Sequence, residues 1–216
     1  MTAAVVFDLD GVIVDSEQVW DGVREELAHE RGGDWHSGAQ RDMMGMSSPE
    51  WSRYMHDRIG LRESPEEINR IVVGRMLQRY ADGPPFIPGA LDAVHRIAAR
   101  FTLGLASSSN RELIDAVLVA GELTQLFRAT VSSEEVASGK PAPDVYLEAA
   151  RRLDVDPAAC VAIEDSHNGI RSAKAAGMTC IAIPNPHFPP GDAVAEADRL
   201  LGSIDELTAE AILRRA

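Results

Sequence analysis

The sequence predicts an α/β protein in which a doubly wound parallel sheet carries an inserted helical domain. Three observations predict this fold. Short apolar runs of the strand type recur along the chain, amphipathic helical patterns separate them, and a long stretch near the N-terminus has helical patterns but no convincing strand. Alternating strands and helices are typical of parallel sheets that have helices on both faces.

Five apolar runs make up the predicted strands. Each is rich in small or β-branched apolar residues, and each ends at a polar, acidic or proline residue. Because their apolar character is continuous rather than alternating, we expect both faces of each strand to be buried. The runs are residues 3–7, 101–106, 129–131, 160–164 and 179–183.

Four amphipathic stripes predict the helices between and around these strands. Their apolar residues recur three or four positions apart, which places them on one helical face. The stripes lie within residues 90–98, 113–118, 146–153 and 170–176, and Gly177 is typical of a helix end. In such a sheet, ligands bind outside the carboxyl ends of the strands. The polar residues that follow the strands are therefore the first candidates for a site.

Residues 16–83 interrupt the alternation. Apolar positions within residues 20–27, 51–55 and 68–80 predict three helices, and the Gly/Pro-rich sequence DGPPFIPG ends the region. We expect a core domain of residues 1–15 and 84–216, and a helical cap domain of residues 16–83 placed over the strand ends. The chain crosses between them near residues 14–17 and 82–88, and these crossings would serve as hinges.

Composition and charge narrow the function. With 34 acidic against 21 basic residues, the formal charge is −13. A nucleic-acid partner would need a basic face, and none is visible. The chain has no signal-peptide pattern and no apolar stretch approaching 18 residues, so we expect a cytoplasmic protein with no membrane partner. Cys160 and Cys180 lack metal-ligand spacing and are expected to be buried free thiols. We expect a monomer, with a dimer as the open alternative.

Acids, a serine and a lysine follow the predicted strands. Asp8 and Asp10 flank Leu9, and alternation places both carboxylates on one side. Each residue also has an ordinary structural interpretation: a strand-end turn, a helix N-cap or a solvated loop lysine. Their convergence at one sheet edge favours a site. The candidates are Asp8, Asp10, Ser107, Lys140, Glu164 and Asp165.

Lys140 stands out because only two of the 21 basic residues are lysines. A chain that otherwise uses arginine keeps a lysine where a compact point charge is useful. The four converging acids outnumber this one cation. Such crowding either keeps one carboxyl protonated or requires a divalent cation. Mg²⁺ suits the site, since it takes a few hard oxygen ligands and retains water or substrate oxygens.

Four sequence motifs, taken in order, resemble those of the haloacid dehalogenase (HAD) superfamily in its phosphatase branch. They are FDLDGVIVDS, LASSSN, SGKPAPD and IEDSHNG. The resemblance covers essentially the whole chain and implies a Rossmann-like HAD core with a helical cap. It also implies a Mg²⁺-dependent phosphatase that acts on a small phosphorylated metabolite.

The resemblance implies a role for each motif residue. Asp8 would be the nucleophile that forms an aspartyl-phosphate, and Asp10 the acid and base. The phosphoryl oxygens would be bound by Ser107, Ser108 and Lys140. Mg²⁺ would be held by Asp8, the Asp10 carbonyl and Asp165, with Glu164 holding a metal-bound water.

Several branches of the superfamily share these motifs. Asp10 argues against dehalogenation, and the absence of lysine in residues 17–82 argues against phosphonoacetaldehyde hydrolysis. The chain is more similar to β-phosphoglucomutase, but it has Trp20 where that enzyme has a cap histidine, and Ser48 or Pro49 where it has an arginine. We therefore favour a sugar-phosphate phosphatase. A phosphohexomutase and a non-catalytic binding module remain the alternatives.

Substrate choice is expected to depend on the cap. Trp20 would stack on a sugar face, Met46 and Ser47 would line the entrance, and Arg70 would meet a second anionic group. The alternative for Trp20 and Met46 is a place in the cap core, and for Arg70 a solvated helix surface. The full set of candidate specificity residues is Trp20, Met46, Ser47, Arg70 and Asn110.

Overall fold

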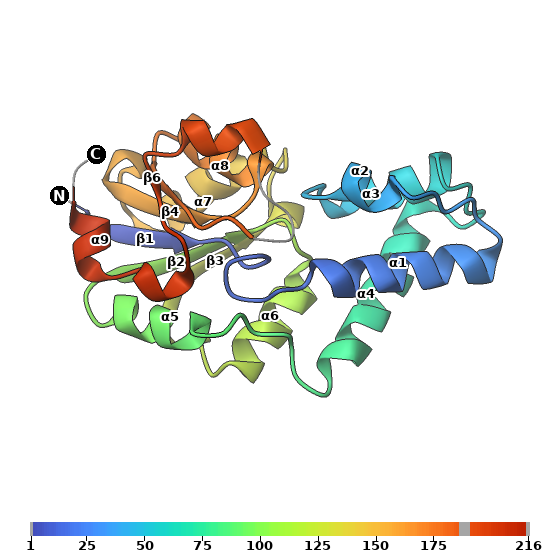
Figure 1. The fold of residues 1–216 in the computed structure, drawn as a ribbon, viewed down its shortest axis with the longest axis horizontal. Helices are drawn as coiled ribbons and strands as arrows, with labels where there is room; N and C mark the ends of the chain where they lie inside the picture. Colours follow the sequence, from blue (N-terminus) through green and yellow to red (C-terminus); the bar gives the residue numbers. More distant parts are fainter. Residues whose placement is uncertain (1, 186–190, 215–216) are drawn as a thin grey trace.

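The computed structural model, which describes residues 2–185 and 191–214, contains a six-stranded parallel sheet in the order β3-β2-β1-β4-β5-β6 (Figure 1). The strands are β1 (Ala4–Phe7), β2 (Thr102–Ser107), β3 (Phe127–Ser132), β4 (Cys160–Glu164), β5 (Thr179–Ala182) and β6 (Arg199–Leu200). The predicted doubly wound fold and its five strands are confirmed. The edge strand β6 was not predicted, because it has two residues and neither is buried.

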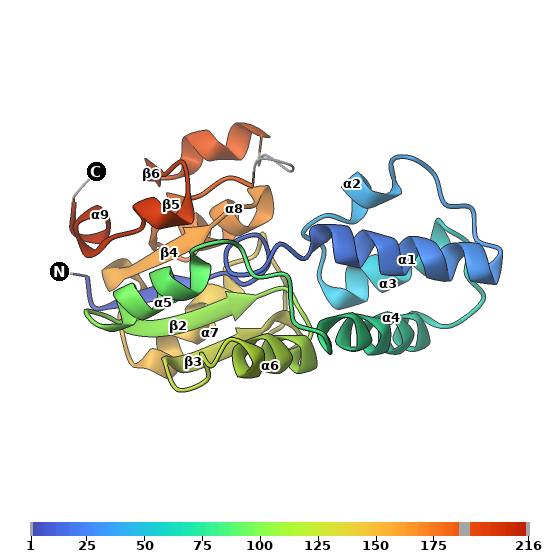
Figure 2. The same cartoon turned by 60° about the horizontal axis from the view of Figure 1, so that its bottom comes forward.

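Helices cover both faces of the sheet (Figures 1 and 2). One face packs against α5 (Ala90–Ala98) and α6 (Arg111–Ala120), and the other against α7 (Asp144–Leu153) and α8 (His167–Ala175). Alternate residues of β1 point to opposite faces, so Val5 joins the first apolar layer and Val6 the second. The remaining elements are η1 (Ser133–Glu135), η2 (Pro157–Ala159), η3 (Gly191–Glu196), η4 (Ile204–Glu206) and α9 (Ala209–Leu213).

Four helices between β1 and α5 form a second body, here called the cap. They are α1 (Glu17–Arg31), α2 (Ala39–Met43), α3 (Ser48–Asp57) and α4 (Pro65–Tyr80). Three of them match the predicted helices, and the five-residue α2 was not predicted. Gly32, in the left-handed region, ends α1, and a capping box of Ser47 and Glu50 begins α3. The cap extends from the carboxyl end of the sheet, opposite the chain termini (Figure 1).

The two chain crossings between core and cap are hydrogen-bonded to each other. Val14 forms an antiparallel bridge with Phe86. The backbone N–H of Asp15 donates to the carbonyl of Pro85 at 2.8 Å, and that of Ile87 donates to Ile13 at 2.9 Å. The crossings therefore form one short two-stranded connection rather than two independent linkers.

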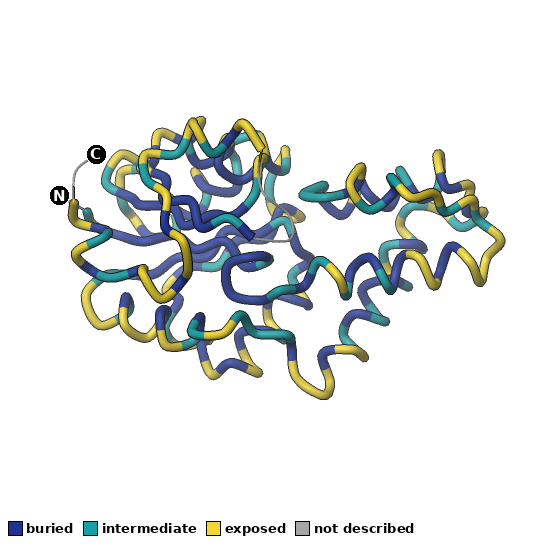
Figure 3. Tube along the Cα trace, in the orientation of Figure 1, coloured by how far each residue is buried: buried dark blue, intermediate teal, exposed yellow. Residues whose placement is uncertain are grey.

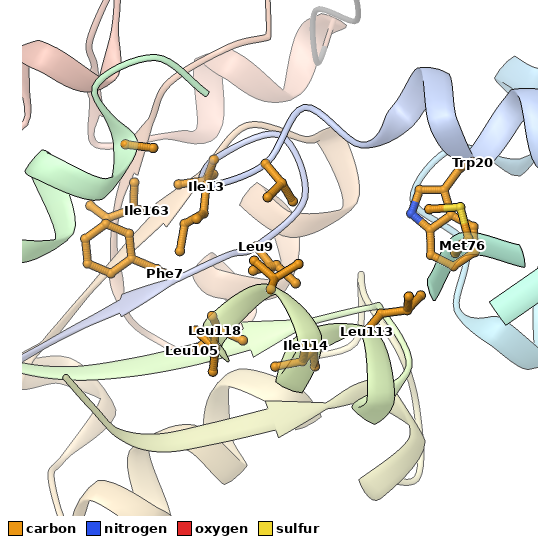
Figure 4. Packing of buried hydrophobic residues seen from close by; sticks show 14 of the residues in the cluster. Phe7, Leu9, Ile13, Trp20, Met76, Leu105, Leu113, Ile114, Leu118 and Ile163 are labelled. Carbon is orange, nitrogen blue, oxygen red and sulfur yellow. The ribbon is translucent and has the colours of Figure 1, made fainter. Parts of the chain in front are cut away.

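The apolar core runs from the sheet into the cap. Phe7 and Leu9 lie in the same buried cluster as Trp20 and Met76 of the cap, and the side chain of Leu113 lies between these two groups (Figure 4). Burial is nearly complete along the central strands and along the inner sides of the cap helices (Figure 3). No helix in residues 2–185 and 191–214 is long and apolar enough to cross a membrane.

Candidate active site

Asp8 and Asp10 lie just beyond β1, where the chain turns sharply. The Asp8 N–H donates to the carbonyl of Ile163 at 3.0 Å, which continues the pairing of β1 with β4. Leu9 points into the core, as expected from alternation. Gly11 has φ +79°, and a Cβ there would lie 1.9 Å from Oδ2 of Asp165. The turn thus brings the first motif against the fourth at a spacing that only glycine allows.

Lys140 is buried at the centre of the site. Its Nζ lies 2.9 Å from Oδ1 of Asp8 and 2.6 Å from Oε1 of Glu164, and only 3% of its side chain is exposed. Burial alone would lower the pKa of Lys140, but the two carboxylates raise it overall, so the ammonium stays charged. This placement excludes the alternative interpretation of Lys140 as a solvated loop residue.

Glu164 is fully buried, and both of its oxygens accept hydrogen bonds. Oε1 accepts from Lys140 and from the hydroxyl of Tyr146 at 2.7 Å. Oε2 accepts from the backbone N–H of Asp165 at 3.1 Å and from Oγ of Ser166 at 3.1 Å. These contacts make Glu164 a positioning residue for Lys140 and for the loop after β4. The predicted role of Glu164 was to hold a metal-bound water; its contacts with Lys140 and Tyr146 were not predicted.

Three acids could hold a metal ion. Carboxylate oxygens of Asp8, Glu164 and Asp165 lie within 4.8 Å of one another. Oδ1 of Asp165 is buried with no hydrogen-bond partner among the described residues. Burial, Glu164 and Asp8 all raise the pKa of Asp165. Burial and Glu164 likewise raise that of Asp8 to about 8, against the opposing effect of Lys140. A divalent cation fits this site because it would offset the excess negative charge.

Asp10 is held from several sides by hydrogen-bond donors. Its Oδ1 accepts from Oγ of Ser16 at 2.5 Å and faces Nε1 of Trp20 at 3.5 Å. Oδ2 accepts from Oγ of Ser109 at 2.7 Å and from that of Ser107 at 3.3 Å. The carboxylate is therefore fixed in orientation at the cavity wall.

Three consecutive serines at the carboxyl end of β2 differ in position. Ser107, a predicted phosphate ligand, is fully buried and contacts Asp10, whereas Ser108, also predicted, lines the cavity. Ser109 lines the cavity as well and was not predicted. A run of three identical residues carries no signal for which side chain points inward.

The site opens into a cavity of about 380 Å³ between the sheet edge and the cap. A cavity of this size accommodates a small metabolite. The core side carries the charged groups of Asp8, Asp10, Lys140 and Asp165. The cap side contributes mainly aromatic, methionine and charged side chains: Glu17, Trp20, Arg24, Arg41, Met43, Met44, Met46 and Trp51.

Among the predicted cap contacts, Trp20 and Met46 line the cavity. Trp20 also packs on Trp51 with ring centres 5.8 Å apart, so it belongs to the cap core as well. Arg70 is not among the lining residues: its side chain is 72% exposed and is ion-paired with Glu67 on its own helix. The predicted contact of Arg70 with a second anionic group has no support in this geometry, because the guanidinium faces solvent.

Ser47 and Asn110 lie outside the lining of the cavity. The Ser47 hydroxyl donates to Glu50 in the capping box of α3. Asn110 joins the core to the cap: its Oδ1 accepts from Ser48 at 2.6 Å, and its amide donates to Asn69 at 3.3 Å. Asn110 thus holds the cap over the site instead of facing a substrate.

Known proteins resemble this chain over nearly its whole length. Residues 5–183 match the family model of haloacid dehalogenase-like hydrolases. Hexitol phosphatase B of Escherichia coli K12 is 34% identical, over 97% of this chain and 96% of its own. The structure of CbbY from Rhodobacter sphaeroides in complex with xylulose-(1,5)bisphosphate is 30% identical, covers 96% of each chain and has a TM-score of 0.86. A putative β-phosphoglucomutase from Thermotoga maritima is 26% identical, with a TM-score of 0.75 over 99% of this chain and 100% of its own.

Proposed function

Since the chain belongs to the haloacid dehalogenase-like hydrolase family, in its sugar-phosphatase branch, we propose that it releases phosphate from a small sugar or sugar-alcohol phosphate through an aspartyl-phosphate on Asp8. It is a phosphoric monoester hydrolase. The observation that carries the proposal is the Asp8 carboxylate, which lines the cavity 2.9 Å from a buried ammonium. That ammonium offsets the charge that would otherwise repel a phosphate from a carboxylate.

The proposed reaction has two steps. An Asp8 oxygen attacks phosphorus and the bond from phosphorus to the ester oxygen breaks, while the Asp10 carboxyl gives its proton to that departing oxygen. Asp10 then takes a proton from water, which attacks the phosphorus of the aspartyl-phosphate and frees Asp8. The serine contacts to Asp10 support this role because they hold one carboxyl in reach of both steps.

Mg²⁺ is the proposed cofactor. Asp8, Asp165 and the backbone carbonyl of Asp10 would hold it, and bound there it would offset the charge of the incoming phosphate. Ser108 and Lys140 would bind phosphoryl oxygens, and Ser107 would act through Asp10. Oδ1 of Asp165 supports the metal assignment: it has no hydrogen-bond partner within residues 2–185 and 191–214, and a buried carboxylate oxygen without a partner is costly.

The decisive test compares the wild-type protein with Asp8→Asn, which conserves shape but removes the nucleophile. With Mg²⁺, the wild type is expected to release phosphate from hexitol and hexose phosphates, and a chelator should stop the release. Asp8→Asn should be inactive. Phosphate release that persists in purified Asp8→Asn would refute the covalent mechanism, and a wild type inactive on a broad panel of phosphate esters would favour the non-catalytic alternative.

A phosphohexomutase is distinguished by its product. Glucose 1-phosphate and a glucose 1,6-bisphosphate primer would be converted to glucose 6-phosphate without net loss of ester phosphate. We expect free phosphate instead. Trp20 supports this expectation, since it stands at the sequence position where the resemblance places the mutase histidine, and its Nε1 faces Oδ1 of Asp10 at 3.5 Å.

A further inference from the structure

The guanidinium of Arg24 lies on the cap side of the cavity and is more than nine-tenths buried. The residue is 5% exposed, and its Cζ lies 4.8 Å from the ring centres of both Trp20 and Trp51. Its Nε has no hydrogen-bond partner among the described residues. A buried donor without a partner is costly, and two indoles hold this one in place. Arg24 therefore lines the cavity as a guanidinium held in place beside two indoles.

Glu17 supplies an acceptor on the same wall. It precedes Arg24 by seven residues on α1, so both lie on one helical face, about 10 Å apart along the axis. Burial raises the pKa of Glu17 from its ordinary value of 4.5 to about 7; Arg24 opposes this shift, and Asp10 and Asp21 add to it. A half-buried acid and a buried base thus border the cap side of the cavity.

The charge of this wall limits what it binds. Four acids and three bases line the whole cavity, and the phosphate to be transferred already takes Lys140. A second phosphate beside Arg24 would also meet the carboxylates of Glu17 and Asp10, and like charges there are costly. A hydroxyl both donates and accepts, so a hydroxylated chain can satisfy Arg24 and Glu17 together.

We propose that Glu17 and Arg24 are specificity-determining residues that select monophosphates with an uncharged, hydroxylated tail and disfavour substrates with a second phosphate. This inference rests on the proposed phosphatase function and deepens it. It separates this chain from its relative that was solved with a bisphosphate, although the two folds agree closely.

The test measures kcat and KM for three substrates: sorbitol 6-phosphate, sorbitol 1,6-bisphosphate and p-nitrophenyl phosphate, which has no hydroxylated tail. The variants are Arg24→Met, Arg24→Lys and the isosteric Glu17→Gln. Arg70→Met is the matched control, because Arg70 is a cap arginine that pairs only with Glu67 in the described structure. Melting temperatures confirm that each variant folds.

The wild type should prefer the monophosphate to the bisphosphate. In Arg24→Met, the ratio of kcat/KM for sorbitol 6-phosphate to that for p-nitrophenyl phosphate should fall about 30-fold, mostly through KM, because a charged hydrogen bond to the tail is lost. Arg24→Lys should lower this ratio by a smaller factor, and Arg70→Met should leave it unchanged. Glu17→Gln should reduce the preference for sorbitol 6-phosphate over sorbitol 1,6-bisphosphate by about tenfold.

Two results would overturn the inference while leaving the phosphatase intact. One is a wild type that prefers the bisphosphate and loses that preference in Arg24→Met, which would make Arg24 a second anion site. The other is an unchanged substrate ratio in both Arg24→Met and Glu17→Gln, which would make these residues purely structural. Failure of the wild type to release phosphate from all three substrates would instead refute the proposed function, and this inference with it.

Discussion

The Lys140 ammonium lies 2.9 Å from the Asp8 carboxylate, and both groups are almost completely buried. The two residues are far apart in the sequence, one after β1 and the other between β3 and α7. Glu164 holds the lysine from the other side at 2.6 Å. One positive charge thus contacts both the proposed nucleophile and Glu164, and its removal should affect both reactivity and stability.

Lys140→Met should lower kcat/KM by about 10²–10³-fold, because the transferring phosphoryl group loses its buried cation. It should also cost about 3–5 kcal/mol of stability, since Asp8 and Glu164 would be left without their counterion. Steady-state kinetics and urea unfolding measure the two effects. Lys174→Met is the control: it removes the other lysine, which pairs with Asp198 at 2.6 Å and is not among the residues that line the cavity. Equal losses in both variants would contradict the assigned role.

Tyr146→Phe tests Glu164 as a positioning residue. The variant deletes the hydroxyl that donates to Oε1 of Glu164 at 2.7 Å, so this buried oxygen would keep only its hydrogen bond from Lys140. We expect a loss of about 1–3 kcal/mol in unfolding free energy and less than a tenfold loss of kcat, because Lys140 still holds the carboxylate. Tyr54→Phe, which removes an exposed hydroxyl bonded to Asp42, should change neither quantity measurably. A kcat loss in Tyr146→Phe as large as that in Lys140→Met would instead give Tyr146 a direct part in the chemistry.

The sheet and its acidic edge could be predicted because their signals are local. Each central strand is a continuous apolar run, and Asp8 and Asp165 directly follow such runs. Parallel topology then brings the two carboxylates together without any knowledge of side-chain packing. Short elements such as β6 and α2 gave no signal, because two to five residues cannot show a periodicity.

The parts that escaped prediction depend on contacts between distant segments. In the sequence, Tyr146 is one apolar position of a helical stripe. Its hydroxyl donates to Glu164 at the end of β4, and this contact between distant segments cannot be inferred from the stripe. The burial of Arg24 was not predicted, because part of its surroundings, Trp51, comes from a different helix. Arg70 had the same sequence character but faces solvent. Spacing within one helix cannot distinguish two arginines whose surroundings come from other elements.

Glu17→Gln should stabilise the ligand-free protein at neutral and higher pH. The pKa of Glu17 is raised to about 7, chiefly by burial, so ionisation of this carboxyl disfavours the folded state. Wild-type stability should therefore fall relative to the variant as pH rises from about 4.5 to 7, reaching a difference of about 2–3 kcal/mol. Urea unfolding at pH 4.5, 6 and 8 measures the difference. Glu25→Gln, at an exposed position of the same helix, should show no such trend. A pH-independent offset in Glu17→Gln would contradict the burial argument.

Gly11→Ala should destroy metal binding, because a Cβ at this position would lie 1.9 Å from the Asp165 carboxylate. Gly177→Ala is a close control: its φ of +80° matches the +79° of Gly11, but no atom lies within 4 Å of its Cβ position. Both variants should lose about 1 kcal/mol through backbone strain. Only Gly11→Ala should also lose the rise in melting temperature that Mg²⁺ gives the wild type, together with at least about 10²-fold in kcat/KM. If the two variants respond equally to Mg²⁺, the acids beyond β1 and β4 do not form the metal site.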